Sequence, residues 1–417
     1  MAQTSWWKQP LHYLRRKAAK FWLNFFPNLT IIGITGSYGK TNTTRAVTQV
    51  LLEKFPTLQT DLNLDTVYNL PITILRLQSK HRALVLEYGV DHKNEMNYHL
   101  ALVKPSIGVI TGINPTHSEP ELLGSLEGII EEKSKLLKAL PEKPAGWAIL
   151  NWDDKRVRKM EKNTKAKVIR YGTTPECDYW AKDINVDFSG TSFTLCQQKE
   201  EIKIKTGLIG RHFIQSCLAA AAVGRIKGLN WEEIKNGLAK LKPLTGRLSI
   251  EKGSRGSILL DDHLRANPAS TLAGLQTLAD LPTKGRRIAI LGEMGELGKS
   301  AKKEHQKIGK ELAKLKKIDY LISVGPFQKL TTQTAIKAGI EKKQVFWVEN
   351  VSKAAEVLKK ILRTGDLIYL KGSLLRHTER ILLILKGKKV GCKVVSCHYY
   401  WQCQNCPYLL SGPPGLK

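Results

Sequence analysis

The sequence predicts an α/β protein: a doubly wound domain that contains a phosphate loop (P-loop), followed by a Rossmann-like α/β domain. Short β-rich runs alternate with helix-like runs along most of the 417 residues, which is typical of parallel sheets covered by helices. The glycine-rich segment "GITGSYGKTNTT", residues 33–44, lies between an apolar run and a helix-like run. Such a strand, loop and helix N-terminus together form a site for a phosphate group.

The glycine-rich segment is a variant of the usual phosphate loop. Gly33 stands one residue too early for the strict GxxxxGK[ST] pattern, and Ile34 takes the first glycine position. A lysine beside backbone donors suits a terminal phosphate, and an adjacent threonine hydroxyl suits a magnesium ion bound to that phosphate. We therefore predict a nucleotide site made of Gly36, Ser37, Gly39, Lys40, Thr41 and Asn42.

The composition is that of a globular protein with two or three domains. No apolar run approaches the roughly 20 residues needed to span a bilayer, and we find no signal peptide, so we expect a cytoplasmic protein. The net charge of +29 favours contact with polyanions. Because the lysines are dispersed over helix-like stretches, they indicate a solvated basic surface and no specific nucleic-acid partner.

Proline and glycine in "KPLTGR" interrupt the alternating pattern, and a second alternating series follows. We therefore expect a basic, aromatic N-terminal helix at 1–28, a central ATPase domain at 29–245, a C-terminal domain at 246–386 and a cysteine-rich tail at 387–417. The first segment carries five basic residues and no acidic one, interleaved with aromatic residues. Two interpretations stay open: this helix lies on anionic lipid at the inner face of the membrane, or it packs on the central domain.

Polar residues follow several of the predicted buried strands, which is where ligands gather in open α/β sheets. Glu87 ends "ALVLE", His117 follows "IGVIT", and "KGS" at residues 371–373 follows "DLIYL". Lys133 lies on a helix-like run. Taken singly, each has an ordinary explanation, such as capping or solvent exposure.

The order of these segments resembles the Mur ligase family, whose members are ATP-dependent amide-bond ligases of peptidoglycan synthesis. The resemblance spans roughly residues 29–386 and rests on ten collinear stretches. They are "GITGSYGKTNTT", "LEYG", "VITGINPTHSE", "SLEGIIEEKSKLL", "AILNWDD", "GLIGRH", "GRLSI", "LLDDHLRANPASTLAGLQTL", "ILGEMGELGKSAKKEH" and "LKGS" followed by Glu379. No single stretch is this specific, so the shared order carries the resemblance.

The resemblance implies a reaction in two steps. An acid first takes the γ-phosphoryl group of ATP to become an acyl phosphate, and an amine then displaces the phosphate. It also implies ATP and Mg²⁺ as cofactors, with a UDP-linked or related muropeptide as the acid and D-alanyl-D-alanine as the amine. On the family pattern Lys40, Glu87, His117 and Lys133 are catalytic, and Lys133 stands where relatives often carry a carbamylated lysine.

The same pattern assigns further contacts. Thr41, Glu87 and His117 would serve the magnesium sites. His212, Arg247 and Asp262 would contact ATP, whereas Asn267, Lys371 and Ser373 would contact the incoming substrates. Arg247 and Asp262 follow the interdomain break, so the resemblance implies a site that is completed, and closed to water, when two domains come together.

Several features depart from the family pattern. Relatives usually have an N-terminal domain that helps hold the UDP-sugar, whereas only about 28 residues precede Leu29 here. Residues that differ from the usual ones are Asp65, Thr66, Phe213, Ser216, His263 and Leu264. Two other functions therefore stay open: a ligase for another acid, of the folylpolyglutamate or cyanophycin type, and a basic NTPase-like binding protein.

The tail contains Cys392, Cys397, Cys403 and Cys406 within 15 residues. Four thiolates at such short range would close a tetrahedral zinc site and fold a segment that lacks a core. The spacing is irregular, with a single CxxC pair, so a tail with free thiols stays open as the alternative.

Overall fold

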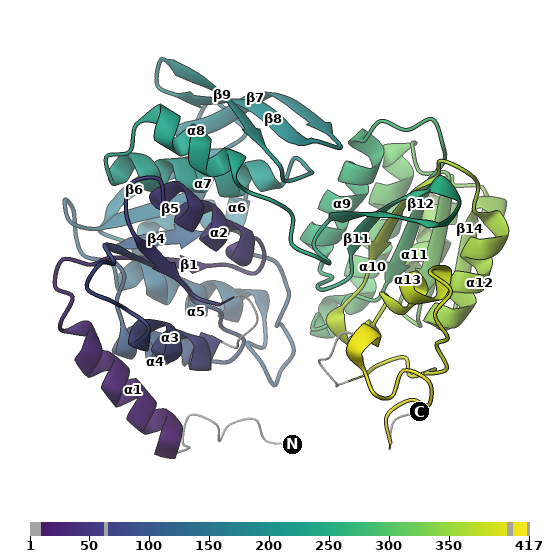
Figure 1. The fold of residues 1–417 in the computed structure, drawn as a ribbon, viewed down its shortest axis with the longest axis horizontal. Coiled ribbons are helices and arrows are strands. Elements are labelled where there is room, and N and C mark those ends of the chain that lie inside the picture. The colour runs from purple at the N-terminus through teal and green to yellow at the C-terminus, as the bar shows by residue number, and fades with distance from the viewer. Residues whose placement is uncertain (1–9, 62–65, 398–402, 415–417) are drawn as a thin grey trace. The chain divides into compact units, whose positions relative to one another are not determined.

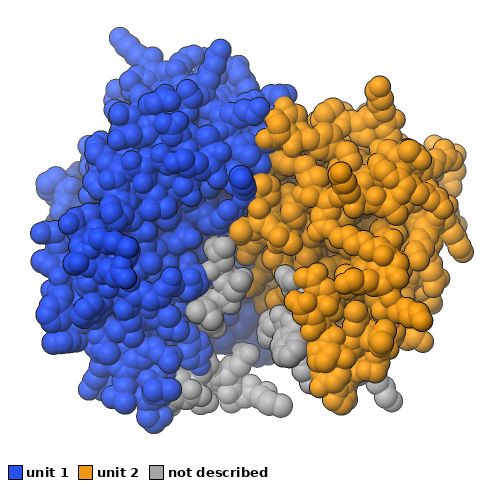
Figure 2. Space-filling model, viewed as in Figure 1, with its two compact units in different colours: residues 1–185, 190–208, 212–242 blue, residues 186–189, 209–211, 243–417 orange. Residues whose placement is uncertain are grey.

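The computed structural model describes residues 10–61, 66–397 and 403–414. The start of the predicted N-terminal segment and the family departure at Asp65 lie outside these residues, and the side chain of Thr66 does as well. The chain forms two compact units, which Figure 2 shows in different colours. The first comprises residues 1–185, 190–208 and 212–242, and the second comprises residues 186–189, 209–211 and 243–417.

The first unit is built on a nine-stranded sheet with the strand order β2-β3-β1-β4-β5-β6-β7-β8-β9 (Figure 1). Strands β1 to β6 are parallel, and β8 and β9 form an antiparallel extension at one edge. The strands are β1 (Thr30–Thr35), β2 (Thr57–Gln59), β3 (Ala83–Glu87), β4 (Ile107–Ile110), β5 (Trp147–Asn151), β6 (Lys167–Gly172), β7 (Tyr179–Asp187), β8 (Gly190–Gln197) and β9 (Glu200–Thr206).

Helices pack around this sheet in two groups (Figure 1). One group is α2 (Lys40–Leu51), α7 (Phe213–Ile226) and α8 (Trp231–Ala239), which pack on one another. The other is α3 (Thr66–Leu75), α4 (Glu95–Leu102) and α5 (Leu126–Lys138), with α1 (Pro10–Leu23) packed on α3. A short helix, α6 (Lys155–Arg158), follows β5. The strands of the parallel part read as apolar runs because helices cover both faces.

The second unit contains a six-stranded sheet with the order β10-β11-β15-β12-β13-β14. Its strands are parallel except for β10 at the edge. They are β10 (Ser249–Lys252), β11 (Ile258–Asp262), β12 (Arg287–Gly292), β13 (Tyr320–Val324), β14 (Val345–Val348) and β15 (Leu367–Lys371). The helices are α9 (Pro268–Asp280), α10 (Ala301–Leu315), α11 (Gln328–Lys337), α12 (Val351–Ile361) and α13 (Arg380–Leu385).

Short 3-10 helices occur at η2 (Glu161–Asn163), η3 (Ser254–Gly256), η4 (Gly298–Ser300), η5 (Lys342–Gln344), η6 (Leu374–Arg376) and η7 (Cys403–Asn405). The predicted fold class is confirmed: a doubly wound domain with a phosphate loop is followed by a Rossmann-like α/β domain. Within the part of the chain that the structure describes, no helix is both long enough and apolar enough to cross a bilayer.

Helix α1 packs on the first unit through one face. The Arg16 guanidinium donates a hydrogen bond to the carbonyl of Tyr98 at 2.7 Å and lies 3.5 Å from the centre of that ring. His12 and Ala19 are buried on the same face. Packing on the central domain is therefore observed, and a second face of α1 remains exposed to solvent.

Candidate functional site

The phosphate loop connects β1 to α2 in a conformation that depends on glycine. Gly39 begins α2 with a φ of 79°, and Gly36 has a φ of 152°. A Cβ atom at Gly36 would lie 2.1 Å from the Thr111 hydroxyl oxygen, so no side chain fits there. The Ser37 N–H donates to the Gly112 carbonyl at 2.7 Å. The loop is thus bonded to the segment that follows β4.

Three predicted site residues follow in the first turn of α2. The Lys40 ammonium donates to the Gly36 carbonyl at 3.0 Å, which folds its side chain back over the loop. Thr41 is buried and Asn42 is half-buried. A lysine ammonium and a helix N-terminus at one loop form an electropositive site for phosphate.

Glu87 lies beside the phosphate loop because of strand register. It pairs with Ile34 across the parallel β1 and β3 strands, one residue before β1 ends. The Thr35 hydroxyl donates to the Tyr88 carbonyl at 2.7 Å, and the Glu87 N–H donates to the Thr60 hydroxyl at 3.1 Å. Glu87 therefore stands at the carboxyl edge of the sheet, beside the strand that leads into the loop.

His117 lies in the segment after β4 and has a φ of 71°. That segment is tied to the phosphate loop at several points. The Ser37 hydroxyl donates to the Asn114 carbonyl at 3.2 Å, and the Thr111 hydroxyl donates to the Tyr38 carbonyl at 2.5 Å. The carboxyl ends of three adjacent strands, β3, β1 and β4, thus bring Glu87, the loop and the segment containing His117 to one edge of the sheet.

Lys133 is fully buried in the middle of α5. Its ammonium lies 3.5 Å from the Val90 carbonyl oxygen. Burial, with a smaller contribution from the charge of Lys40, lowers the pKa of Lys133 to about 7. At neutral pH a large fraction of this lysine is therefore an uncharged, nucleophilic amine.

Sequence reasoning missed a group of possible metal ligands, of which Asp91 and Glu95 are acidic residues near Lys133. Asp91, His92 and Glu95 each place one ligand atom within 4.8 Å of the others. Burial and the neighbouring Asp91 charge raise the pKa of Glu95 to about 8, whereas the charges of His117 and His92 outweigh burial and lower the pKa of Asp91. The signal was available, because "VDHKNE" follows Glu87 almost directly at a strand end.

His212 directly precedes α7, the helix that packs on α2. The Thr43 and Ser216 hydroxyl oxygens lie 3.0 Å apart between these helices, and Phe213 is buried. Two residues that depart from the family pattern, Phe213 and Ser216, thus contribute to helix packing. The ATP contact assigned to His212 stays a prediction.

In the second unit, Asp262 and Lys371 form a buried ion pair. They are opposite one another at the carboxyl ends of β11 and β15, with 2.6 Å between the ammonium nitrogen and a carboxylate oxygen. The Tyr369 hydroxyl donates to the same oxygen at 3.1 Å. Burial raises the pKa of Asp262 and lowers that of Lys371, which opposes charge on both groups.

The remaining predicted residues of the second unit have structural partners. Arg247 closes a turn through its N–H, which donates to the Leu244 carbonyl at 2.9 Å. The Asn267 side chain caps α9 by accepting from the Ser270 N–H at 2.9 Å. Ser373 precedes η6 and is half-buried. Their substrate and ATP contacts stay predictions.

The structure does not bring together the four thiols of the predicted tail zinc site. All four tail cysteines are described, yet no three of their sulfur atoms lie within 4.8 Å of one another among the described residues. Cys392 and Cys397 instead pack with Val394 in a small apolar cluster, and the Arg380 guanidinium lies 3.3 Å from the Cys392 sulfur. The spacing alone could not show that these thiols face different neighbours.

A phosphate loop flanked by an acidic residue, a histidine and a buried lysine defines a nucleotide-binding α/β protein. Residues 34–224 match the Mur ligase middle domain, and residues 246–374 match the Mur ligase, glutamate ligase domain. The chain belongs to the Mur ligase family.

Relatives of known activity are similar over most of the chain. The UDP-N-acetylmuramoyl-tripeptide–D-alanyl-D-alanine ligase of Escherichia coli K12 is 34% identical over 297 residues, which is 71% of this chain and 64% of that enzyme. The ligase of the same name from Haemophilus influenzae is 30% identical over 88% of this chain and 79% of that enzyme. The match thus spans less than two thirds of the E. coli relative.

Solved structures agree with the fold. The crystal structure of MurF from Acinetobacter baumannii superposes with a TM-score of 0.80 at 25% identity, covering 90% of this chain and 81% of that one. MurF ligase from Thermotoga maritima, solved in complex with ADP, has the same fold, with a TM-score of 0.78 at 24% identity and coverage of 90% and 84%.

Proposed function

We propose that this protein is an ATP-dependent amide ligase of peptidoglycan precursor synthesis that joins a muropeptide to D-alanyl-D-alanine. The observation that carries the proposal is the shared sheet edge where Glu87 and the phosphate loop meet, in a chain 30–34% identical to ligases named for this reaction. ATP use is also supported by the relative solved with ADP. The UDP-linked form of the muropeptide is proposed from the relatives' names.

The chemistry requires two displacements. A carboxylate oxygen of the muropeptide attacks the γ-phosphorus of ATP, forming an acyl phosphate and releasing ADP. The amine of D-alanyl-D-alanine then attacks the acyl carbon, and inorganic phosphate leaves as the amide forms. Negative charge accumulates in the first step, so Lys40 and the loop N–H groups would stabilise it by preorganised electrostatics.

The first unit offers donor groups that suit a magnesium ion. The Thr41 hydroxyl, the Glu87 carboxylate and the His117 imidazole would hold the ion, and hard carboxylate oxygens of Asp91 and Glu95 lie around Lys133. When bound, Mg²⁺ neutralises phosphate charge and orients the γ-phosphoryl group. The position of Glu87 beside the strand that leads into the phosphate loop supports this assignment.

Lys133 fits the role of a carbamylated lysine. An uncharged amine attacks CO₂ to give a carbamate and one proton, and the lowered pKa of Lys133 supplies that amine near neutral pH. The carbamate converts a buried cation into an anion, which suits a metal site. In the second unit Arg247, Asp262, Asn267, Lys371 and Ser373 would contribute to ATP and peptide binding.

The substrates required for ADP release distinguish the proposed function from two alternatives. The first alternative is a ligase for another acid: folylpolyglutamate synthase of Mycobacterium tuberculosis has the same fold at 17% identity. The second is an NTPase-like binding protein, which would hydrolyse ATP without an acid and an amine. We therefore measure ADP release with the UDP-muramoyl-tripeptide and D-alanyl-D-alanine supplied singly and together. Release that requires both supports the proposal; release with neither, or with a folate and glutamate instead, contradicts it.

We also propose that α1 attaches this protein to the cytoplasmic surface of an anionic membrane. Leu11, Leu14 and Phe21 recur at helical spacing along α1 and are 69%, 61% and 65% exposed, and Phe25, just after the helix, is 61% exposed. Ala18 completes the same stripe, and basic residues flank it. An exposed apolar stripe between basic residues matches the chemistry of an anionic lipid surface, with acyl chains beneath acidic headgroups.

A further inference from the structure

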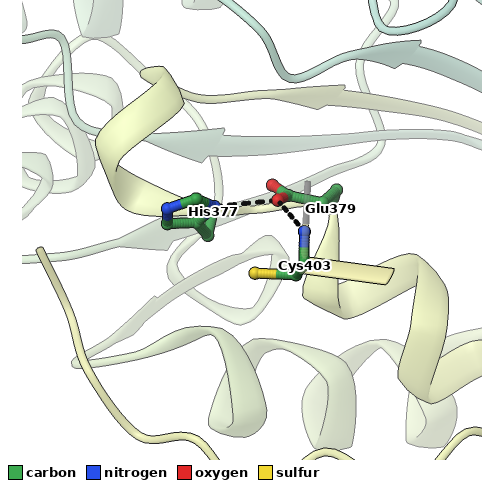
Figure 3. A group of neighbouring side chains, drawn as sticks. All are labelled: His377, Glu379 and Cys403. Atoms are coloured by element: carbon green, nitrogen blue, oxygen red, sulfur yellow. Dashed lines mark hydrogen bonds and ion pairs between the residues drawn. The ribbon is translucent and has the colours of Figure 1, made fainter. Parts of the chain in front are cut away.

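Within the second unit, the C-terminal tail packs on the segment before α13 at a cluster of three buried residues (Figure 3). His377 follows η6, Glu379 directly precedes α13, and Cys403 begins η7 in the tail. His377 and Glu379 are two residues apart, whereas Cys403 follows 24 residues after Glu379, so its contact with them reflects tertiary folding. None of them has a part in the proposed ligase reaction.

The His377 ring and the backbone N–H of Cys403 both contact the Glu379 carboxylate (Figure 3). The His377 Nδ1 atom lies 2.9 Å from Glu379 Oε1, and the Cys403 N–H donates to the same oxygen at 3.3 Å. One ligand atom from each residue lies within 4.8 Å of the other two. A single ion between them would thus need only small side-chain movements.

Two polar atoms of the cluster are buried without a hydrogen-bond partner, Glu379 Oε2 and His377 Nε2. Glu379 is 8% exposed and His377 is 1% exposed. Leaving a buried carboxylate oxygen unpaired is costly, and most such atoms in proteins have a partner or bind an ion. The unpaired Glu379 oxygen therefore supports a bound ion independently of the proximity of the three residues.

We propose that His377, Glu379 and Cys403 bind one divalent transition-metal ion, of which Zn²⁺ is the best match. Nitrogen, carboxylate and thiolate ligands together are typical of zinc, whereas magnesium and calcium prefer oxygen alone. Coordination replaces the proton on the Cys403 sulfur, which passes to solvent. Three protein ligands leave a fourth position for water or another group.

The surroundings suit a metal that holds the tail in place. The Arg380 guanidinium is 1% exposed and donates to the carbonyls of Cys392 and Val394 at 2.9 Å and 2.6 Å. It therefore already fixes the start of the tail next to Glu379. The ion would join the tail to α13 at a second point.

The test uses the full-length protein, stripped with a chelator and titrated with Co²⁺ as a spectroscopic substitute for Zn²⁺. We expect one Co²⁺ per chain and a thiolate-to-cobalt charge-transfer band in the near ultraviolet. Cys403→Ser should abolish the band, and Glu379→Gln and His377→Gln should each weaken binding at least about tenfold. Cys406→Ser, three residues along the tail, and Cys217→Ser, buried in α7, are the matched controls and should keep the band.

Three results would overturn the proposal: no stoichiometric metal, a band that survives in Cys403→Ser, or a band lost equally in Cys406→Ser. Circular dichroism of each variant separates loss of binding from loss of folding. The readout needs no ATP and no peptide, so it is independent of the ligase activity.

Discussion

The Lys371 ammonium and the Asp262 carboxylate are in contact at 2.6 Å, and both side chains are almost fully buried. They terminate adjacent parallel strands, β15 and β11, so strand register fixes the pair. A buried pair of opposite charges costs desolvation on both sides and is retained through its hydrogen bonds, here including one from Tyr369. It forms a rigid charged end to the second sheet.

Removing one member of this pair should destabilise the second unit strongly. Asp262→Asn or Lys371→Met leaves an unpaired buried charge, which costs about 3–5 kcal/mol. The double variant restores neutrality and should cost clearly less than the sum of the single variants. Chemical denaturation of all three variants measures this coupling, and additive losses would show that the pair is not energetically linked.

Activity should depend on CO₂ through Lys133. Its amine becomes uncharged as pH rises through about 7, so ligase activity in bicarbonate-containing buffer should rise between pH 6 and pH 8. CO₂-depleted buffer should lower activity, and added bicarbonate should restore it. Lys133→Ala should be inactive and insensitive to bicarbonate. An equal bicarbonate response in Lys135→Ala is the expected control, because Lys135 is paired with Glu132 on the same helix.

The pH dependence of the unfolding free energy should also reveal the lowered pKa of Lys133. Folding lowers the pKa of Lys133 from its ordinary value of 10.5, so the unfolded chain binds more protons between about pH 7 and pH 10.5. The contribution of Lys133 to stability should therefore rise with pH across this window in CO₂-free buffer. The difference in unfolding free energy between wild type and Lys133→Met, followed from pH 7 to pH 10, would show no trend if the lysine were not buried.

Gly36→Ala should abolish nucleotide binding. The new Cβ would lie 2.1 Å from the Thr111 hydroxyl oxygen and 3.0 Å from the Gly112 carbonyl oxygen, so the loop must move. Calorimetric titration with ADP should show affinity reduced at least a hundredfold. Gly124→Ala separates the clash from backbone strain, because Gly124 also has a positive φ but has open space around it. Equal losses in both variants would argue against the packing explanation.

Leu14→Asp and Phe21→Asp should weaken attachment to anionic vesicles. Each removes about 1.5–3 kcal/mol of apolar burial in the bilayer surface, which is roughly a tenfold to hundredfold change in affinity. Co-sedimentation with vesicles containing phosphatidylglycerol measures this, with Leu52→Asp, an exposed leucine outside α1, as the control. Equal binding to neutral vesicles, or a dimer that these substitutions dissociate, would contradict a lipid role for α1.

Much of the fold followed from the sequence because the local signals were strong. Apolar strands such as those ending at Glu87 and Asp262 mark the sheets, and the loop before Lys40 marks the first strand–helix turn. Side-chain partners were harder to predict, because they depend on tertiary contacts. The spacing of the tail cysteines suggested one shared site, whereas the fold directs Cys403 towards Glu379 and leaves Cys392 with Arg380.

The central claim is that an acid is activated by phosphoryl transfer and then captured by an amine. The most direct measurement supplies the muropeptide with ¹⁸O in its reacting carboxylate, together with ATP and D-alanyl-D-alanine, and analyses the products by mass spectrometry. The account predicts the extended peptide and inorganic phosphate that carries one ¹⁸O atom, because the carboxylate oxygen leaves with the phosphate. Peptide formed with unlabelled phosphate, or labelled substrate recovered unchanged while ATP is hydrolysed, would contradict it.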